Sequence, residues 1–382
     1  MKYYLIAGEA SGDLHGSNLM RGLYAADPRA DIRFWGGALM DAVYGEHQQG
    51  SGLVKDYREG AVLGFVEILK NARSLMNKLR FCQDDILSWK PDAVVLIDYP
   101  GFNLRVAEFA HKAGFKVFYY IVPKVWASRE GRIAQLKAFV DRLYIVFPFE
   151  VPYFESKGVP FSYVGNPLVD AVDASPALKE SRDAFLTRTG LPDAPWITLL
   201  AGSRGHEIKA MMPVFMALAD RWHRTHPQMH FVIAGAPSRT AADYDTGDRP
   251  WVHLVFGETY GALRHAQAAV INSGTASLEA ALIGTPQVVG YRMAYGTYVM
   301  LKGMIKVKFV SLANLIIDRA AFRELLQDYF TPENLSDELE RILSDQDYRR
   351  RMFSDYSEIR QRLGGPGASV RVAGEMVKAL GD

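Results

Sequence analysis

The sequence predicts an α/β protein built from two doubly wound parallel sheets, followed by a helical C-terminal segment. Short apolar segments of strand-forming residues alternate with helical patterns along most of the 382 residues, as in chains of β-α-β units. The alternation begins again after a polar stretch with four prolines, residues 165–195. A chain of this length also exceeds what one core usually holds, so two domains are expected.

The expected elements follow in order along the chain. In the first half, strand candidates are residues 3–8, 32–37, 93–98, 116–122 and 142–147, with helical patterns near 14–25, 61–81, 103–113 and 129–139. In the second half, strand candidates are residues 196–202, 230–236, 252–257, 268–274 and 286–291, and after about residue 320 the pattern is purely helical. We therefore expect an N-terminal domain over 1–170, a second domain over 190–345, and helices over 346–382 that pack back on the N-terminal domain or on a partner protomer. Ligands of such sheets bind at the carboxyl ends of the strands, here in a cleft between the two domains.

Composition restricts the class of function. A formal net charge of +1 gives no support for nucleic-acid binding, and the single cysteine, Cys82, excludes an internal disulfide framework and a cysteine-based zinc site. The N-terminus lacks a secretory h-region, and no stretch reaches the ~18 apolar residues of a membrane span. We expect a cytoplasmic protein, with attachment to a membrane surface left open.

Several common site motifs are missing. Pro227 breaks the helical pattern among His223, His226 and His230, so these histidines predict no shared metal site. No GxxxxGK loop is present, and no complete GxGxxG follows a strand candidate, so the sequence predicts neither a P-loop ATPase nor an NAD enzyme.

The first strand candidate runs into a glycine-rich turn, "IAGEASGDLHG", residues 6–16. A strand, a glycine turn and a helix often bind phosphate through backbone N–H groups. Here the turn carries Glu9 and Asp13, whose carboxylates repel phosphate. The motif is therefore expected at a site, but not as a simple phosphate cradle.

Two later turns predict anion binding. In residues 199–218 a strand ends at Gly202 and a helix begins near His206, so Ser203, Arg204 and the free N–H groups of the turn would attract an anion. The alternative is an arginine that is merely solvated in a turn.

In residues 270–289, the turn Ser273-Gly274-Thr275 again lies between a strand and a helix, with Ser273 or Thr275 as the expected N-cap. Glu279 lies one helical turn after Thr275 on the same face. An anion site beside an acceptor suits a nucleoside diphosphate and its ribose hydroxyls. The alternative for Glu279 is an exposed position on the helix.

Asp98 ends the strand candidate "PDAVVLID". A catalytic carboxylate is expected at such a carboxyl end. The equally weighted alternative is an aspartate that caps the turn or a helix beginning near Asn103.

Residues 61–81 form a basic amphipathic pattern, in which Phe65, Leu69 and Met76 belong to one apolar stripe. Such a helix rests on an anionic membrane or contacts an acyl chain, although a stripe of this kind is more often a core face.

These pieces, in this order, resemble the lipid-A-disaccharide synthases, a family of GT-B glycosyltransferases. The matching stretches are "AGEASGD" (7–13), "LIDYPGFN" (96–103), "VPKVWASREGRI" (122–133), "VGNPLVD" (164–170), "AGSRGHEI" (201–208), "NSGTASLEAALIGTPQVVGYRM" (272–293) and "FVSLANLI" (309–316). The resemblance implies two Rossmann-like domains facing a cleft, with the acceptor on the first and UDP on the second.

The resemblance also implies a reaction. UDP-2,3-diacylglucosamine is joined to 2,3-diacylglucosamine 1-phosphate (lipid X), which gives a β-1′,6 disaccharide and UDP with inversion at the anomeric carbon. Asp98 would be the general base, with Arg204 and Asn314 as further catalytic groups and no metal or cofactor. The implied substrate-binding residues are Ser11, Gly12, Ser203, Phe256, Gly257, Ser273, Gly274, Thr275 and Glu279.

Both implied substrates carry acyl chains, so Phe65, Leu69 and Met76 are expected to meet these chains or the inner leaflet of the inner membrane of a Gram-negative bacterium. A homodimer formed by exchange of the C-terminal helices is a further expectation. The rival readings are a UDP-sugar transferase or epimerase for soluble substrates, and a two-domain protein that binds a nucleotide without turnover.

Overall fold

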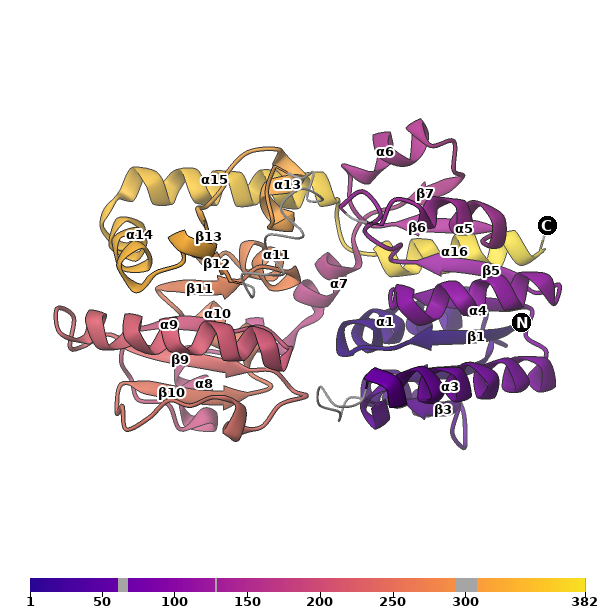
Figure 1. The fold of residues 1–382 in the computed structure, drawn as a ribbon, viewed down its shortest axis with the longest axis horizontal. Coiled ribbons are helices and arrows are strands. Elements are labelled where there is room, and N and C mark those ends of the chain that lie inside the picture. The colour runs from indigo at the N-terminus through magenta and orange to yellow at the C-terminus, as the bar shows by residue number, and fades with distance from the viewer. Residues whose placement is uncertain (61–67, 128, 293–307, 382) are drawn as a thin grey trace. The chain divides into compact units, whose positions relative to one another are not determined.

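The computed structural model describes residues 1–60, 68–127, 129–292 and 308–381, and these divide into two compact units (Figure 1). The first unit holds Met1–Ala171 and Leu363–Asp382, and the second holds Val172–Arg362. Each unit contains one parallel sheet with helices, so the predicted fold class of two α/β domains with a helical C-terminus is confirmed.

The sheet of the first unit has the strand order β3-β2-β1-β4-β5-β6-β7, with every pair parallel. Its strands are β1 (Lys2–Ala7), β2 (Asp31–Gly36), β3 (Leu53–Asp56), β4 (Ala93–Ile97), β5 (Lys116–Tyr120), β6 (Arg142–Ile145) and β7 (Phe161–Tyr163). Its helices are α1 (Ala10–Ala26), α2 (Ala38–His47), α3 (Ile68–Trp89), α4 (Pro100–Lys112), α5 (Arg132–Phe139), α6 (Glu150–Ser156), α7 (Pro167–Ala174), which ends in the second unit, and α16 (Ala368–Gly381). The central strand β4 is buried at every residue, as expected for a strand covered by helices on both faces.

The chain order reverses between β1 and β4 in this sheet. From β1 the chain goes to β2 on one side, whereas from β4 it goes to β5 on the other. The two strands are direct neighbours, with Ala7 opposite Ile97. The turns that follow them, which contain Glu9 and Asp98, therefore lie side by side at the switch point, where open α/β sheets bind their ligands.

The sheet of the second unit has the order β10-β9-β8-β11-β12-β13. Its strands are β8 (Trp196–Leu200), β9 (His230–Gly235), β10 (Val252–Phe256), β11 (Ala268–Asn272), β12 (Gln287–Tyr291) and β13 (Glu324–Leu326). Its helices are α8 (Arg182–Thr189), α9 (Gly205–His223), α10 (Thr259–Arg264), α11 (Thr275–Ile283), α13 (Leu312–Ile317), α14 (Pro332–Ser344) and α15 (Gln346–Leu363). Its switch point lies between β8 and β11, so the turns at Ser203 and Ser273 are neighbours in this unit.

The last two helices belong to different units. Apart from its final residue, α15 lies in the second unit, whereas α16 packs against α1 of the first. A Cβ on Gly22 of α1 would lie 2.9 Å from the Cβ of Ala373, so this glycine allows a close approach of the two helices. Asp170 accepts backbone hydrogen bonds from Gly367 at the start of α16 and from Ser369 (2.9 Å) in its first turn.

Asp13 caps a neighbouring helix rather than facing a ligand. Its carboxylate accepts hydrogen bonds from the backbone N–H groups of Gly37 (2.8 Å), Leu39 (3.1 Å) and Met40 (3.0 Å) at the start of α2. The side chain is buried. Asp13 is therefore the capping residue of α2.

Replacing Asp13 with Ala is expected to lower the free energy of unfolding of the first unit by about 2–4 kcal/mol, because the buried N–H groups of Gly37 and Met40 and the partly buried N–H of Leu39 lose their acceptor. Asp41→Ala is the matched control, since Asp41 is exposed in the first turn of the same helix. Urea unfolding of both variants measures the difference. Equal midpoints for the two would contradict the capping role.

Candidate active site

Asp98 lies in a tight turn between β4 and α4. Asp98 and Tyr99 have φ values of 47° and 48°, so two successive non-glycine residues adopt the left-handed conformation. The Asp98 carbonyl accepts hydrogen bonds from the Asn103 amide (2.8 Å) and the Tyr119 hydroxyl (2.7 Å), which hold the turn. Helix α4 begins at Pro100 with Tyr99 as its N-cap, so the predicted helix start near Asn103 is wrong, and the alternative that Asp98 caps the turn stays a prediction. Backbone strain of this kind is kept where the surroundings enforce it, and often at functional sites.

The glycine loop packs on this turn. A Cβ on Gly8 would lie 2.3 Å from Cδ1 of Tyr99, so Gly8 is needed for the tyrosine ring to lie against the loop. Ser11 is exposed in the first turn of α1, whereas Gly12 is buried, with Ala7 near the position of a Cβ. Of these two predicted contact residues, Ser11 is therefore the one that is exposed at the surface.

The predicted anion turn of the second unit already holds a carboxylate. The N–H groups of Ser203 and Arg204 each donate to Oε2 of Glu207 at 3.1 Å, so Glu207 caps α9 from within the helix. The Arg204 side chain is 61% exposed, with Nη1 3.5 Å from Oε1 of Glu207. Sequence reasoning missed Glu207, although an acidic residue three positions after an N-cap is a known sign of such a cap.

Arg239 adds a second guanidinium to this turn. Its Nε donates to the Ser203 carbonyl at 3.0 Å, and its Nη1 would lie 3.4 Å from a Cβ on Gly205. Arg239 follows β9, the strand beside β8. No local sequence pattern indicates that its side chain lies at the start of α9.

The second turn of this unit has a bare helix start. The N-cap of α11 is Gly274, not the predicted Ser273 or Thr275, and it makes no side-chain cap hydrogen bond. Its φ of 155° is a conformation that L side chains rarely adopt. Thr275 is exposed, and the Ser277 hydroxyl donates to the Gly274 carbonyl at 2.8 Å. The first N–H groups of a helix have no partner within the helix, so this start can receive an anion.

The two turns touch at the switch point. The Asn272 amide donates to the Ala201 carbonyl at 3.3 Å, and a Cβ on Gly202 would lie 2.4 Å from the same amide nitrogen. Gly202 has a φ of 99°, in the left-handed region. The structure therefore brings together Ser203, Arg204, Ser273, Gly274 and Thr275 as predicted.

Glu279 lies one turn further along α11 and is half-buried. The alternative prediction, that Glu279 occupies an exposed position on the helix, is therefore wrong. Its carboxylate accepts a hydrogen bond from the Tyr260 hydroxyl at 2.9 Å. Desolvation raises the pKa of the Glu279 carboxyl, and the tyrosine hydrogen bond opposes this rise. The carboxyl is thus placed and oriented by the protein before any ligand binds.

Phe256 ends β10 and Gly257 follows it, at the same edge of the sheet. The Phe256 side chain is 38% exposed, and its ring lies against Gly235, where a Cβ would be 2.4 Å from the ring. Gly257 adopts a φ of 74°. A half-exposed aromatic face beside a glycine turn is a suitable platform for a planar base.

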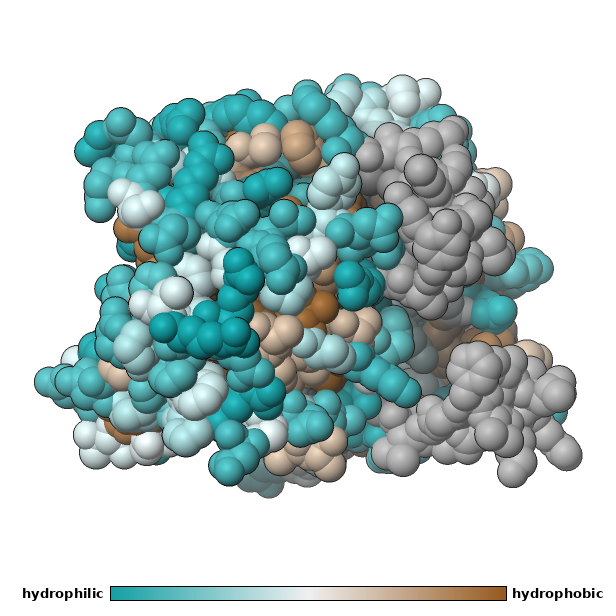
Figure 2. Space-filling model, turned by 60° about the vertical axis from the view of Figure 1, so that its left-hand side comes forward, coloured by the Kyte–Doolittle hydropathy of each residue, from teal (hydrophilic) through white to brown (hydrophobic). Residues whose placement is uncertain are grey.

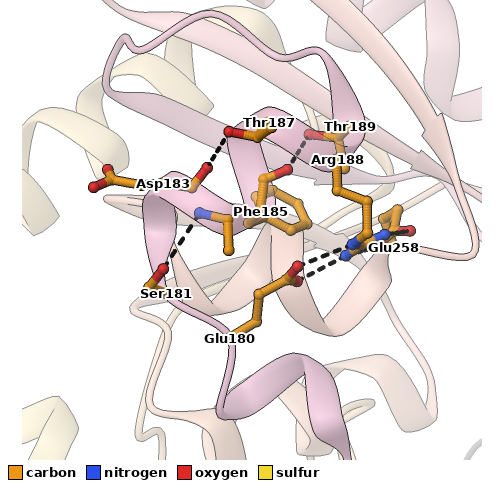
Figure 3. A network of polar contacts seen from close by, with 9 residues as sticks. Glu180, Ser181, Asp183, Phe185, Thr187, Arg188, Thr189 and Glu258 are labelled. Carbon is orange, nitrogen blue, oxygen red and sulfur yellow. Dashed lines mark hydrogen bonds and ion pairs between the residues drawn. The ribbon is translucent and has the colours of Figure 1, made fainter.

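An ion-pair network fixes the residue after this turn (Figure 3). Arg188 of α8 bonds both carboxylate oxygens of Glu258 and both of Glu180, with distances of 2.9 Å to Glu258 Oε2 and 2.7 Å to Glu180 Oε2. Bidentate arginine pairs restrict orientation as well as distance. The network therefore anchors the Phe256–Glu258 segment to α8.

Asn314 is buried and faces inward. Its amide nitrogen donates to the Phe322 carbonyl (3.1 Å) and to Glu324 (2.9 Å), and its oxygen accepts from the Ala321 N–H (2.8 Å). Glu324 in turn accepts from the backbone N–H of Ser311 at 3.0 Å. Asn314 thus holds residues 310–324 together, and the predicted contact with a substrate stays a prediction.

The predicted apolar stripe is only partly described. Phe65 lies outside the described residues, as does the side chain of Leu69. Met76 on α3 is 47% exposed, whereas Leu79 and Cys82 of the same helix are buried in the core. Helix α3 therefore has a core face and also an exposed apolar side chain at Met76.

In the described parts of the chain, no helix is long and apolar enough to cross a membrane. Figure 2 shows one face of the molecule, on which hydrophobic residues form small patches among polar ones.

Across the same described residues, no three His, Cys, Asp or Glu side chains are grouped to hold a metal ion.

Glu150 is a buried carboxyl that the sequence did not reveal. It accepts hydrogen bonds from the Trp126 indole (2.9 Å) and from the N–H groups of Val146 (3.1 Å) and Phe147 (3.0 Å), and so joins the turns that follow β5 and β6. Burial raises the pKa of Glu150 to about 7, and the hydrogen bond from Trp126 is the largest opposing influence.

This shift predicts a pH effect on stability. Between pH 4.5, the ordinary pKa of the carboxyl, and about pH 7, folded Glu150 keeps a proton that the unfolded chain has lost. Its contribution to stability is therefore complete below pH 4.5 and is lost as the pH rises towards 7, by up to about 3 kcal/mol.

Urea unfolding at several pH values should show that the free-energy difference between wild type and Glu150→Gln falls across this window. Glu155→Gln is the control, because Glu155 is exposed on the same helix, α6. If the difference in unfolding free energy between wild type and Glu150→Gln stays constant with pH, the raised pKa of Glu150 is contradicted.

The two parallel-sheet units with C-terminal helices define a fold of the GT-B class. A UDP-GlcNAc 2-epimerase from Neisseria meningitidis, solved with UDP-GlcNAc, matches this chain with a TM-score of 0.70 at 15% identity, covering 99% of this chain and all of the other. The calicheamicin glycosyltransferase CalG4 matches with a TM-score of 0.57 at 16% identity, over 99% and 98% of the two chains. At such identities these likenesses show the fold alone.

The chain belongs to the lipid-A-disaccharide synthase family. The family model described as lipid-A-disaccharide synthetase matches residues 3–371. The lipid-A-disaccharide synthase of Trichlorobacter lovleyi is 36% identical over 378 residues, which are 97% of this chain and 95% of that protein. The enzyme of that name from Myxococcus xanthus is 37% identical over 380 residues, 98% and 97% of the two chains. The protein is thus a glycosyltransferase of lipid A biosynthesis, as the resemblance of its motifs predicted.

Proposed function

We propose that this enzyme transfers 2,3-diacylglucosamine from UDP-2,3-diacylglucosamine to the 6-hydroxyl of lipid X, giving the β-1′,6-linked lipid A disaccharide 1-phosphate and UDP. The observation that carries the proposal is that the switch points of the two sheets carry different functional groups. The first unit presents a carboxylate at Asp98, and the second presents arginines and a bare helix start. Family membership supports the choice of substrates.

Asp98 acts as the general base in this proposal. As the acceptor oxygen O6 bonds to the anomeric carbon of the donor, the bond from that carbon to the UDP oxygen breaks, and the hydroxyl proton passes to the Asp98 carboxylate. A single displacement of this kind inverts the anomeric centre. The turn around Asp98 supports the role, because hydrogen bonds to its carbonyl from Asn103 and Tyr119 hold the backbone in place.

The second unit binds UDP. Arg204 and Arg239 provide positive charge near the diphosphate, together with the N–H groups of Thr275 and its neighbour at the start of α11. Glu279 accepts from a ribose hydroxyl, and the uracil lies against Phe256 and Gly257. Ser203 and Ser273 line the same turns, and Asn314 acts at a distance by holding residues 310–324.

We further propose that the enzyme works on the inner face of the inner membrane, because both substrates carry acyl chains. Phe65, Leu69 and Met76 on the 61–81 segment would meet these chains or the bilayer, while Ser11 and Gly12 would contact the acceptor sugar. The exposure of Met76 supports this placement. Liposome binding by a variant with charges at the three apolar positions tests it, and unchanged binding would contradict it.

The test of the reaction is product formation in mixed micelles that contain both lipid substrates and no added metal. Release of UDP together with a disaccharide phosphate is the expected result. Turnover of UDP-GlcNAc in place of the diacyl donor would instead favour a UDP-sugar transferase or epimerase that acts on soluble substrates. UDP binding without any turnover would contradict an enzyme at this site.

A further inference from the structure

Three arginines of the first unit lie on or beside two helices that pack together, and none of them pairs with an acidic side chain among the described residues. They are Arg105 on α4, Arg129 in the turn before α5, and Arg132, the first residue of α5, and α4 packs against α5. Desolvation lowers the pKa of the Arg132 guanidinium, and the nearby charges of Arg129 and Arg105 lower it further. Arg132 is thus within electrostatic reach of both Arg129 and Arg105.

The acidic residues nearest in sequence are already engaged. Glu108 pairs with Lys112 at 2.6 Å, and Glu130 pairs with Lys157 at 2.6 Å. Within the described portion of the chain, no ion pair joins any of the three arginines to a carboxylate. Arg105 donates instead to the carbonyl of Gly101. The cluster is therefore a concentration of positive charge for which the described residues provide no carboxylate.

The cluster lies beside the Asp98 turn. Tyr119 connects the two, because its hydroxyl donates to the Asp98 carbonyl at 2.7 Å and its pKa responds to both Asp98 and Arg132. The burial of Tyr119 raises its pKa, Asp98 raises it further, and Arg132 opposes the rise. Arg132 is thus within electrostatic reach of the residue proposed as the base.

Two backbone features add to the attraction for an anion. The N-cap of α5 is Gly131, which makes no side-chain cap hydrogen bond, so the positive end of this helix faces the same region. Arg129 adopts a φ of 56°, uncommon for a residue with a side chain, and its carbonyl accepts the N–H of Arg132 at 3.0 Å. The strained turn brings Arg129 next to Arg132.

We propose that Arg105, Arg129 and Arg132 form a phosphate-monoester site that binds the anomeric phosphate of the acceptor sugar. Guanidinium groups suit a phosphate dianion because each can donate two parallel hydrogen bonds to its oxygens. The site is separate from the UDP turns, which belong to the second unit. The identity of the ligand as the acceptor rests on the proposed function, whereas the affinity for a sugar phosphate does not.

The first test uses the full-length enzyme in neutral-detergent micelles with Arg132→Met and Arg105→Met. The KM for lipid X should rise about 10–100-fold in each, the loss expected for a charge-assisted hydrogen bond. The KM for the UDP donor and the turnover of 2,3-diacylglucosamine, which lacks the phosphate, should not change. Arg142→Met is the matched control, since Arg142 is exposed at the opposite end of the same sheet, where β6 begins. Equal losses with both acceptors would overturn the proposal.

A binding measurement separates this site from the reaction. Phosphorus NMR titration with glucosamine 1-phosphate should show saturable binding to wild type and at least about tenfold weaker binding to Arg132→Met. Saturable binding by an enzyme that forms no disaccharide would leave the phosphate site standing and refute the proposed function. No binding to wild type would overturn the site. Loss of binding to phosphatidylglycerol vesicles with an unchanged KM for lipid X would assign the cluster to lipid headgroups and overturn the acceptor assignment.

Discussion

Asp98→Asn should lower the rate of disaccharide formation by a factor of about 10² to 10⁴ while leaving the affinity for UDP unchanged. The amide keeps the size of the carboxylate but cannot take the proton from the acceptor hydroxyl. The turn should survive the change, because its hydrogen bonds from Asn103 and Tyr119 go to the backbone carbonyl of residue 98. The measurement is the steady-state rate of UDP release with saturating lipid X.

The control for this variant is Asp92→Asn. Asp92 is exposed just before β4, at the other end of the strand that leads to Asp98, and it accepts a hydrogen bond from the Lys2 N–H that an asparagine can also accept. Its activity should match wild type. Full activity in Asp98→Asn would place the base elsewhere, and the exposed Glu9 of the neighbouring loop would be the next residue to replace.

Arg204→Gln should lower kcat by a factor of about 10² and weaken UDP binding, because it removes a permanent charge from the place where the leaving diphosphate gains negative charge. The fold of the turn does not depend on this side chain, since Glu207 bonds the backbone N–H groups of Ser203 and Arg204. Steady-state kinetics with varied donor concentration separate the two effects.

Arg204→Lys should recover part of the lost rate, because it restores the charge without the planar donor pair. Arg221→Gln is the matched control on the same helix, where its side chain is 51% exposed and 3.8 Å from Glu333. A kcat for Arg204→Gln equal to that of Arg221→Gln would remove Arg204 from the site.

The sequence predicted the parts of the site that depend on local pattern. A short continuous apolar run rich in β-branched residues, such as 93–97, is typical of a buried strand, and here it is β4, so the residue after it lies at the carboxyl edge of the sheet. The positions of Asp98, Ser203 and Ser273 follow from this rule. The alternation of strands and helices likewise gives the fold class without any tertiary detail.

What the sequence did not predict depends on partners far apart in the chain. Asp13 caps a helix whose N-cap, Gly37, lies 24 residues later, and Glu150 accepts a hydrogen bond from the indole of Trp126 in the turn after β5. The glycine-rich turn is visible in the sequence, but the reason for a glycine at position 8 is not, because the ring of Tyr99 lies against it. No local pattern encodes such contacts, because they form only when separate strands become neighbours.

The most direct test of the account is the anomeric configuration of the disaccharide made by the wild-type enzyme from the α-linked UDP donor, determined by proton NMR of the product. A single displacement with Asp98 as base predicts a β linkage throughout. An α linkage would contradict the account, since retention requires either a second displacement or a reaction on the face of the sugar that UDP leaves.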